Sequence, residues 1–183
     1  MPLTLRPAGP ADLPALVTLM NTAYRGVGKE ASWNTESRYI DGPRTSETHL
    51  LDEIARKPKA CLLVAQESRG GPLLGCVLLA PLEDGRWHLG SLAVDPPLQK
   101  SGLGRRLLEA AEAWAAQRGA TIIEIEVVNV RDTLIAWYER RGYRLTGATN
   151  PFPYGDSRFG TPLRDDLSFV LLEKSLAASK NLV

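Results

Sequence analysis

Residues 99–105 combine the residue types and the spacing that bind a phosphate group. Gly102 and Gly104 lie within this segment, which follows an apolar stretch at 89–94 and precedes a helix-forming segment. Two glycines let the backbone approach an anion closely, and a new helix end presents unpaired N–H groups with a partial positive charge. Arg105, directly after the second glycine, adds charge. This context predicts a cradle for a pyrophosphate built from main-chain donors.

The flanking residues separate this segment from two other phosphate-binding loops. A dinucleotide-binding fingerprint places a third small residue at position 107, where this chain has Leu107. It also needs an acidic residue at a strand end downstream, and none lies at that distance. A P-loop places a lysine directly after its last glycine, whereas here Arg105 follows Gly104. A Gly-x-Gly turn by itself can simply redirect the chain, so the interpretation depends on a second motif.

The two motifs together resemble those of one family. The pattern Leu92-x-Val94, followed by Gln99-x-x-Gly102-x-Gly104, resembles the acyl-CoA-binding motif of the GNAT superfamily of N-acetyltransferases. Residues 132–143 resemble the other signature of that family, a short helix ending in Tyr-Glu-x-x-Gly-aromatic, here from Tyr138 to Tyr143. Asp132 suits an N-cap, and Gly142 suits a left-handed C-cap. An aromatic residue on such a helix often only packs in the core, but beside the first motif we interpret Tyr138 as catalytic.

The resemblance implies transfer of an acetyl group from acetyl-CoA to an amine. The pantetheine arm would run along the strand at 92–94, and the Leu92 N–H would polarise the thioester carbonyl. The residues implied in binding the cosubstrate are Leu92, Ala93, Val94, Gln99, Lys100, Ser101, Gly102, Leu103, Gly104 and Arg105. Arg131 stands where many members have an asparagine seven residues before the tyrosine. In those members the asparagine helps to hold the pantetheine or the adenosine side of the cosubstrate. Arg131 either replaces it by pairing with a phosphate, or this contact is absent here.

The reaction needs a base and an acid. An alkyl ammonium has a pKa of about 10, so a proton must leave before or during attack. His88 lies where some family members carry a carboxylate base, and a water relay is an equal alternative. Glu124 and Glu126, which alternate along the next strand, are second candidates for the base. Tyr138 would protonate the departing thiolate, since its ordinary pKa of about 10 keeps its hydroxyl protonated at neutral pH.

The composition excludes several other classes of function. The 183 residues, with 44% hydrophobic and 23% charged side chains, predict a single domain over 1–183. A formal net charge of +1 predicts no binding to nucleic acid or to an anionic membrane, and Arg140 and Arg141 are expected on a solvated helix end. Two histidines and two cysteines without metal spacing predict no metal site and two reduced thiols. The apolar runs are too short for a signal peptide or a membrane span, which predicts a cytoplasmic protein.

Periodicity and turn residues place the elements that position these motifs. Predicted strands lie at 3–6, 61–67, 73–79, 87–94, 121–128, 143–146 and 167–172. Predicted helices lie at 10–26, 47–56 and 103–118 and around Tyr138, and the polar residues 27–48 read as a loop-rich insert. This order resembles the GNAT fold over nearly the whole chain. It implies an α+β architecture with a mixed, mostly antiparallel sheet of six to seven strands. About four helices would flank the sheet, which would splay between its fourth and fifth strands.

Our first hypothesis is that the acceptor is the primary amine of a small metabolite or an amino acid-like metabolite. Two alternatives stay open, a non-catalytic module that senses acyl-CoA and an enzyme for protein or peptide amines. An acceptor ammonium could lie in an aromatic and acidic pocket of Trp33, Glu36 and Asp41. An acceptor carboxylate could instead be bound by Arg38, Arg44 or Arg164. The walls of the acceptor cleft could be formed by Phe152, Tyr154 and Phe159. The last strand could pair across a homodimer, so the chain could be a monomer or a homodimer.

Overall fold

A seven-stranded sheet forms the centre of the computed structural model, which describes residues 3–26 and 35–176. Its strand order is β1-β3-β4-β5-β6-β9-β7, and every pairing is antiparallel except that of β5 with β6. The strands are β1 (Thr4–Pro7), β3 (Cys61–Gln66), β4 (Gly75–Pro81), β5 (Arg86–Val94), β6 (Ile122–Val128), β7 (Arg144–Pro151) and β9 (Ser168–Ser175). The mixed, mostly antiparallel sheet predicted from the sequence is confirmed.

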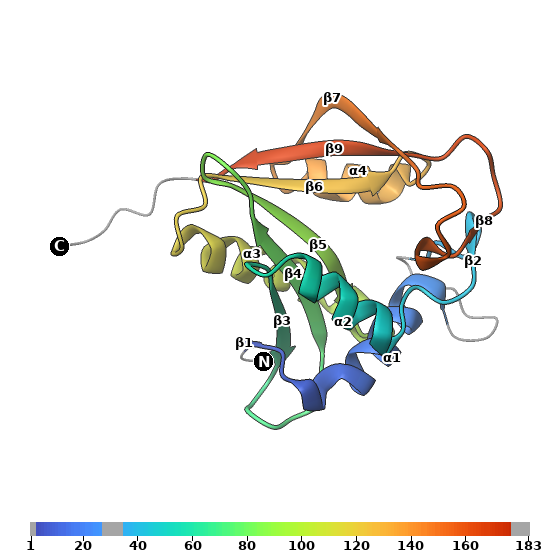
Figure 1. The fold of residues 1–183 in the computed structure, drawn as a ribbon. Helices are drawn as coiled ribbons and strands as arrows, with labels where there is room; N and C mark the ends of the chain where they lie inside the picture. Colours follow the sequence, from blue (N-terminus) through green and yellow to red (C-terminus); the bar gives the residue numbers. More distant parts are fainter. Residues whose placement is uncertain (1–2, 27–34, 177–183) are drawn as a thin grey trace.

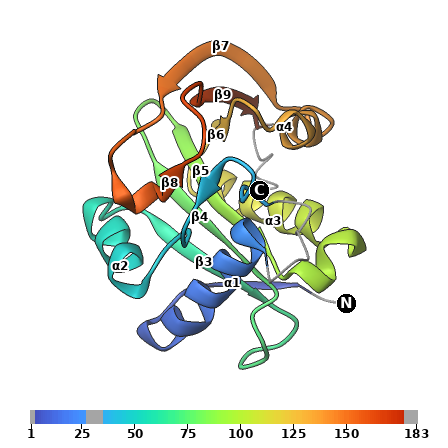
Figure 2. The ribbon, with the colours of Figure 1, turned by 90° about the vertical axis from the view of Figure 1, so that its right-hand side faces the viewer.

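Four α-helices cover the two faces of this sheet (Figures 1 and 2). They are α1 (Leu13–Arg25), α2 (Glu47–Arg56), α3 (Leu103–Ala116) and α4 (Asp132–Glu139). Alternate residues of a strand point to opposite faces, so Leu62 and Val64 of β3 pack in the cluster under α1 and α2. Leu63 and Ala65 pack in the other cluster, with residues of α3 and α4. Both faces of the central strands are therefore buried. Within the described residues, no helix combines the length and apolarity needed to cross a bilayer.

The sheet opens between β5 and β6, its fourth and fifth strands along the chain. These strands pair only over Arg86–His88 and Ile122–Glu124, and beyond His88 they diverge, as Figure 1 shows. A parallel ladder keeps adjacent strands about 4.8 Å apart, so the end of pairing leaves room between the two backbones. The splay expected from the family resemblance is confirmed. It creates the space in which the candidate site lies.

A β-bulge lies in β5 next to this opening. The register of β4 with β5 shifts by one residue between Cys76 and Leu78, which pair with Ala93 and Gly90. Ser91, inside the bulge, has φ of 49°, a left-handed conformation that is uncommon for a residue with a side chain. The bulge interrupts the ladder and redirects the backbone at the start of the 92–94 segment.

Two short elements escaped the sequence analysis. β2 (Ile40–Asp41) pairs with β8 (Thr161–Pro162) in a separate two-stranded sheet. Two-residue strands are too short to show a periodicity, and their partners lie about 120 positions apart in the chain. Ile40 packs in a third apolar cluster with Phe152 and Leu167, so this small sheet joins the 35–45 and 152–167 segments over one end of the opening.

Candidate active site

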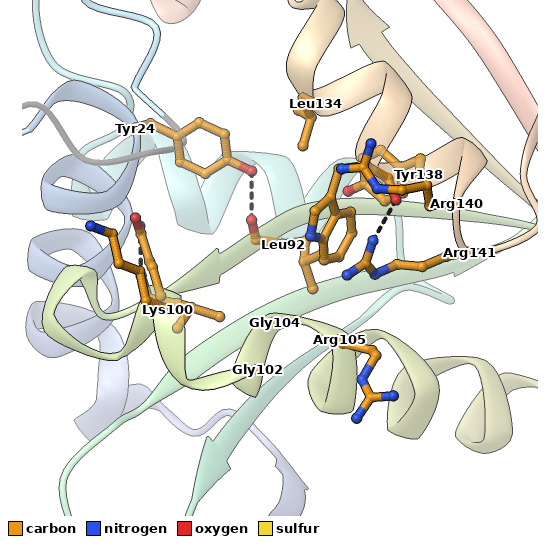
Figure 3. Close-up of a pocket in the computed structure, with 13 residues that line it drawn as sticks. Tyr24, Leu92, Lys100, Gly102, Gly104, Arg105, Leu134, Tyr138, Arg140 and Arg141 are labelled. Carbon is orange, nitrogen blue, oxygen red and sulfur yellow. Dashed lines mark hydrogen bonds between the residues drawn. The ribbon is translucent and has the colours of Figure 1, made fainter.

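A cavity of about 370 Å³ lies between the end of β5, the start of α3 and one face of α4 (Figure 3). Its lining includes these residues implied in cosubstrate binding: Leu92, Val94, Gln99, Lys100, Gly102, Gly104 and Arg105. Three other implied residues do not line it. Ala93 and Leu103 are buried in the core, and the Ser101 Oγ donates to the Leu98 carbonyl at 2.6 Å.

The glycine turn opens α3 toward the first cavity. Gly102 is the N-cap of the helix, with φ of +79°, and a Cβ built on it would meet no atom within 4 Å. The first intrahelical bond in this turn runs from the Arg106 N–H to the Gly102 carbonyl, at 3.2 Å. The preceding N–H groups of the first turn have no partner inside the helix. An open cradle bounded by helix N–H groups fits a phosphate.

Arg141 lines the first cavity together with three other cationic residues, Lys100, Arg105 and Arg140. Its guanidinium stacks 3.6 Å from the Trp137 ring centroid, and its Nη1 donates to the Trp137 carbonyl at 2.6 Å. Burial lowers the pKa of Arg141, and repulsion from Arg140 and Arg105 lowers it further. Its Nε is buried and, within the described residues, has no hydrogen-bond partner. An anionic group in the cavity would satisfy this donor and relieve the repulsion.

The prediction that Arg140 and Arg141 form a solvated helix end is therefore only half right. Both residues line the first cavity, but Arg140 is exposed, whereas Arg141 is half-buried. The signal was present in the sequence, because Arg141 follows Leu134 by seven positions and Tyr138 by three. Those spacings put all three residues on one helical face.

A second cavity of about 260 Å³ lies on the other side of the same opening, under the small β2–β8 sheet. Tyr24, Leu92, Leu134 and Tyr138 line both cavities. The two spaces therefore meet at the bulged part of β5. Such an arrangement lets two ligands approach each other from opposite sides.

Tyr138 lies where the two cavities meet. It is buried and contacts the rings of Trp137 and Tyr143 edge-on, at centroid distances of 5.0 and 5.4 Å. Burial raises the pKa of Tyr138 well above its ordinary value of 10. Its hydroxyl is therefore a proton donor throughout the neutral range. Packing on two aromatic rings holds the side chain in one position.

Tyr24 of α1 is a site residue that the sequence analysis missed. Its hydroxyl donates to the Leu92 carbonyl at 3.0 Å, and burial raises its pKa to about 12. Tyr24 follows Met20 by four positions and Ala23 by one, so it resembles one more core residue of an amphipathic helix. Only the packing of α1 on β5 brings its hydroxyl to the bulge (Figure 3).

His88 lines the second cavity, and Glu126 lines it as well. Burial, followed by the charge of Lys57, lowers the pKa of His88 below its ordinary value of 6.5, against an opposing effect of nearby glutamates. Its imidazole is therefore neutral at pH 7 and can accept a proton. Glu126 accepts a bond from the Asn150 Nδ2 at 2.5 Å. Glu124 lies outside this cavity and is paired with Arg86.

Arg131 lines the second cavity rather than the first. Its Nη1 lies 2.8 Å from the Glu36 Oε1, and the other carboxylate oxygen of Glu36 lies 2.7 Å from the Arg25 Nη1. All three side chains are about nine-tenths buried. Arg131 also precedes α4 as its N-cap, whereas Asp132, expected as the cap, is the first helical residue. The ion-pair network thus ties α1 and the 35–45 segment to the helix that carries Tyr138.

Residues 22–143 match the acetyltransferase (GNAT) family. The chain belongs to this family of acetyltransferases. An IAA acetyltransferase from Azospirillum brasilense is 32% identical over 118 residues, which cover 63% of this chain and 76% of the relative.

Solved structures show the same fold as this acetyltransferase. The ribosomal-protein-S18-alanine N-acetyltransferase from Escherichia coli has a TM-score of 0.65 and 21% identity over 99% of both chains. The IAA acetyltransferase from Bacillus cereus ATCC 14579 has a TM-score of 0.62 and 19% identity, over 95% of this chain and 99% of the other.

The candidate acceptor residues of this acetyltransferase separate into two groups. Glu36, Arg44, Phe152 and Phe159 line the second cavity. Asp41, Arg38, Tyr154 and Arg164 are exposed and do not line it, and Arg164 is paired with Asp166. Trp33 lies outside the described residues. The ion pairs of Glu36 with Arg25 and Arg131 leave it poorly suited to bind an ammonium.

Proposed function

We propose that this GNAT enzyme transfers an acetyl group from acetyl-CoA to the primary amine of a small acceptor, by direct attack in a ternary complex. The observation that carries the proposal is the junction of two cavities at Tyr138 and the bulge of β5. The first cavity has the N-terminus of α3 and three arginines, which suit the binding of phosphates. The second cavity has the neutral imidazole of His88, which can act as the general base.

The second cavity supports a small acceptor. Its volume of about 260 Å³ is close to the lower end of the range of about 300–1,000 Å³ for small-molecule sites. The relative with 32% identity is named IAA acetyltransferase, whereas the neighbour named for a ribosomal protein shares 21% identity. Both observations favour a small molecule over a protein or peptide amine.

Acetyl-CoA, when bound, supplies the acetyl group as a reactive thioester. The N–H groups at 102–105 would hold its pyrophosphate, and Arg141, with Arg105 and Arg140, would hold anionic oxygens. The Leu92 N–H would bind the thioester carbonyl oxygen, and Tyr24 holds that strand segment by its bond to the Leu92 carbonyl. Because these groups are ordered before binding, little conformational entropy is lost when the ligand arrives.

The protons move between two side chains and the reacting atoms. His88, directly or through one water, takes a proton from the acceptor ammonium, and the amine nitrogen then forms its bond to the acetyl carbon. As the carbon–sulfur bond breaks, the Tyr138 hydroxyl gives its proton to the sulfur. As the amide forms, its nitrogen loses a second proton, which restores the Tyr138 hydroxyl directly or through water, and His88 releases the first proton to solvent. The products are an amide and a free thiol.

Release of the CoA thiol from acetyl-CoA tests the proposal, measured against amino acids, polyamines, aminoglycosides, arylamines and short peptides. We expect release that depends on one class of small amine. If peptides gave the fastest release, the acceptor would be a polypeptide amine and not a small molecule. Tight CoA binding without turnover on any amine would support a sensing module instead.

Arg141→Gln should raise the Kd for CoA about tenfold, because a charge-assisted bond to an anion is lost. Titration calorimetry at low and high salt measures this change, and the difference from the wild type should shrink as salt screens the arginine. Arg144→Gln, which changes an exposed arginine three positions away, is the matched control. Equal affinity of Arg141→Gln and the wild type would remove Arg141 from the binding site.

His88→Gln should lower kcat/KM at least tenfold at pH 7.5, on the scale of a lost general base. In the wild type, activity should fall with decreasing pH as the imidazole is protonated. The pKa of His88 is lowered, so this fall should lie below pH 6.5. The variant should lose the acidic limb of the pH profile. An unchanged limb in the variant would assign the base to another group, such as Glu126 or a water.

A further inference from the structure

Arg44 lies at the wall of the second cavity, and its backbone is anchored to α1. Its backbone N–H donates to the Asn21 Oδ1 of α1 at 2.6 Å. Its guanidinium lies 5.3 Å from the ring centroid of Tyr24, the residue whose hydroxyl binds the Leu92 carbonyl. A group bound by Arg44 is therefore held beside the strand segment at which the two cavities meet.

The other charged side chains of the second cavity have partners. Glu36 is paired with both Arg25 and Arg131. The Lys57 Nζ lies 3.8 Å from a Glu53 carboxylate oxygen, and Glu126 accepts from Asn150.

Arg44 differs from these groups. It is half-buried, and within residues 3–26 and 35–176 it makes no ion pair with a carboxylate. Among the described residues, its guanidinium faces the Tyr24 ring and no carboxylate. A partly desolvated guanidinium in such a position retains its capacity to bind a carboxylate in two parallel bonds.

The wall contributed by the late part of the chain is apolar and aromatic. Phe152, Phe159 and Phe169 line it, and the ring of Phe152 lies 6.3 Å from that of Phe159 and 5.6 Å from that of Phe169. Ile40 and Val128 pack in the same cluster and line the same cavity. This wall provides no counter-charge for a cation and would favour a hydrocarbon or aromatic body on the acceptor.

We propose that the acceptor is an amine that also carries a carboxylate and an apolar or aromatic body, and that Arg44 binds the carboxylate. This inference rests on the proposed acetyl transfer and specifies its substrate class. Arg44 acts on specificity: it orients the amine toward β5 and takes no proton. Of the three arginines that the sequence offered for this role, Arg44 lines the cavity, while Arg38 and Arg164 are exposed outside it.

Matched acceptors test the inference. Phenylalanine is compared with phenylalaninamide and phenethylamine, and leucine with leucinamide and isoamylamine, by CoA thiol release. We expect kcat/KM to be about 10- to 100-fold higher for the carboxylates, the scale of a charge-assisted bidentate contact. Arg44→Gln should remove most of this preference by lowering kcat/KM for the carboxylates alone. Arg44→Lys should keep part of the preference, and Arg38→Gln, a change in the same segment but outside the cavity, should leave it intact.

A binding measurement separates this inference from the proposed function. The wild type and Arg44→Gln are saturated with CoA and titrated with N-acetylphenylalanine and N-acetylphenethylamine by ligand-observed NMR. Tighter binding of the carboxylate by the wild type alone supports the inference. Equal turnover of amines with and without a carboxylate would overturn the inference and uphold acetyl transfer. Absence of turnover on any amine would refute the proposed transfer, and equal binding of the two products would then overturn the role of Arg44 as well.

Discussion

Tyr138→Phe should lower kcat at least tenfold while leaving the Kd for CoA nearly unchanged. Loss of a general acid costs roughly 10²- to 10⁴-fold in model cases, and water can replace part of the lost function. The variant keeps the ring, so the edge-on contacts with Trp137 and Tyr143 remain. Since burial raises the pKa of Tyr138, the wild-type hydroxyl should stay protonated well above pH 9, and no activity should be lost there through its ionisation.

Steady-state kinetics and CoA calorimetry together measure this effect. Tyr143→Phe is the matched control, because Tyr143 is also buried but donates its hydroxyl to Glu112 at 2.9 Å, away from both cavities. That control should lower the thermal midpoint of unfolding and leave kcat nearly unchanged. A Tyr138→Phe enzyme with wild-type kcat would remove the hydroxyl from the mechanism.

Glu36→Ala should lower the free energy of unfolding by about 3 kcal/mol or more. The substitution leaves Arg25 and Arg131 buried without the carboxylate that both now contact, and breaking a buried ion pair costs about 3–5 kcal/mol. Chemical denaturation measures the change. Because Arg131 precedes the helix of Tyr138, kcat should fall as well, with little change in CoA affinity.

Two further variants separate charge from packing at this network. Glu36→Gln keeps the shape and can still accept from one arginine, so its loss of stability should lie between those of the wild type and Glu36→Ala. Glu109→Ala removes the exposed partner of Arg105 in α3 and should leave the denaturation midpoint unchanged. If Glu36→Ala and Glu109→Ala unfolded at the same denaturant concentration, the buried network would contribute little to stability.

Local patterns in the sequence predicted most elements. The helix expected at 47–56 has those bounds, because Ser46 caps it with a bond from the His49 N–H and its apolar residues repeat at helical spacing. The continuous apolar runs of β3 and β4 predicted two strands, and both faces of these strands are buried. The strand predicted at 143–146 runs to Pro151, because pairing with β9 extends it beyond the point where its own pattern ends.

Long-range contacts account for what the sequence analysis missed. The bond from Tyr24 to Leu92 joins residues 68 positions apart, and the pair of Arg131 with Glu36 joins residues 95 positions apart. Neither contact leaves a trace within a window of one helix or strand. The bulge at Ser91 likewise depends on the register of β5 against β4.

The amino-acid sequence by itself determined the order of the longer elements, the glycine turn before α3 and the short helix that carries Tyr138. Those features depend on backbone conformation and periodicity over a few neighbouring residues. Only the tertiary structure decided which cavity each charged side chain faces: Arg141 lines the first, while Arg44 and Arg131 line the second. The reason is physical, since burial and ion pairing depend on atoms that distant segments bring together.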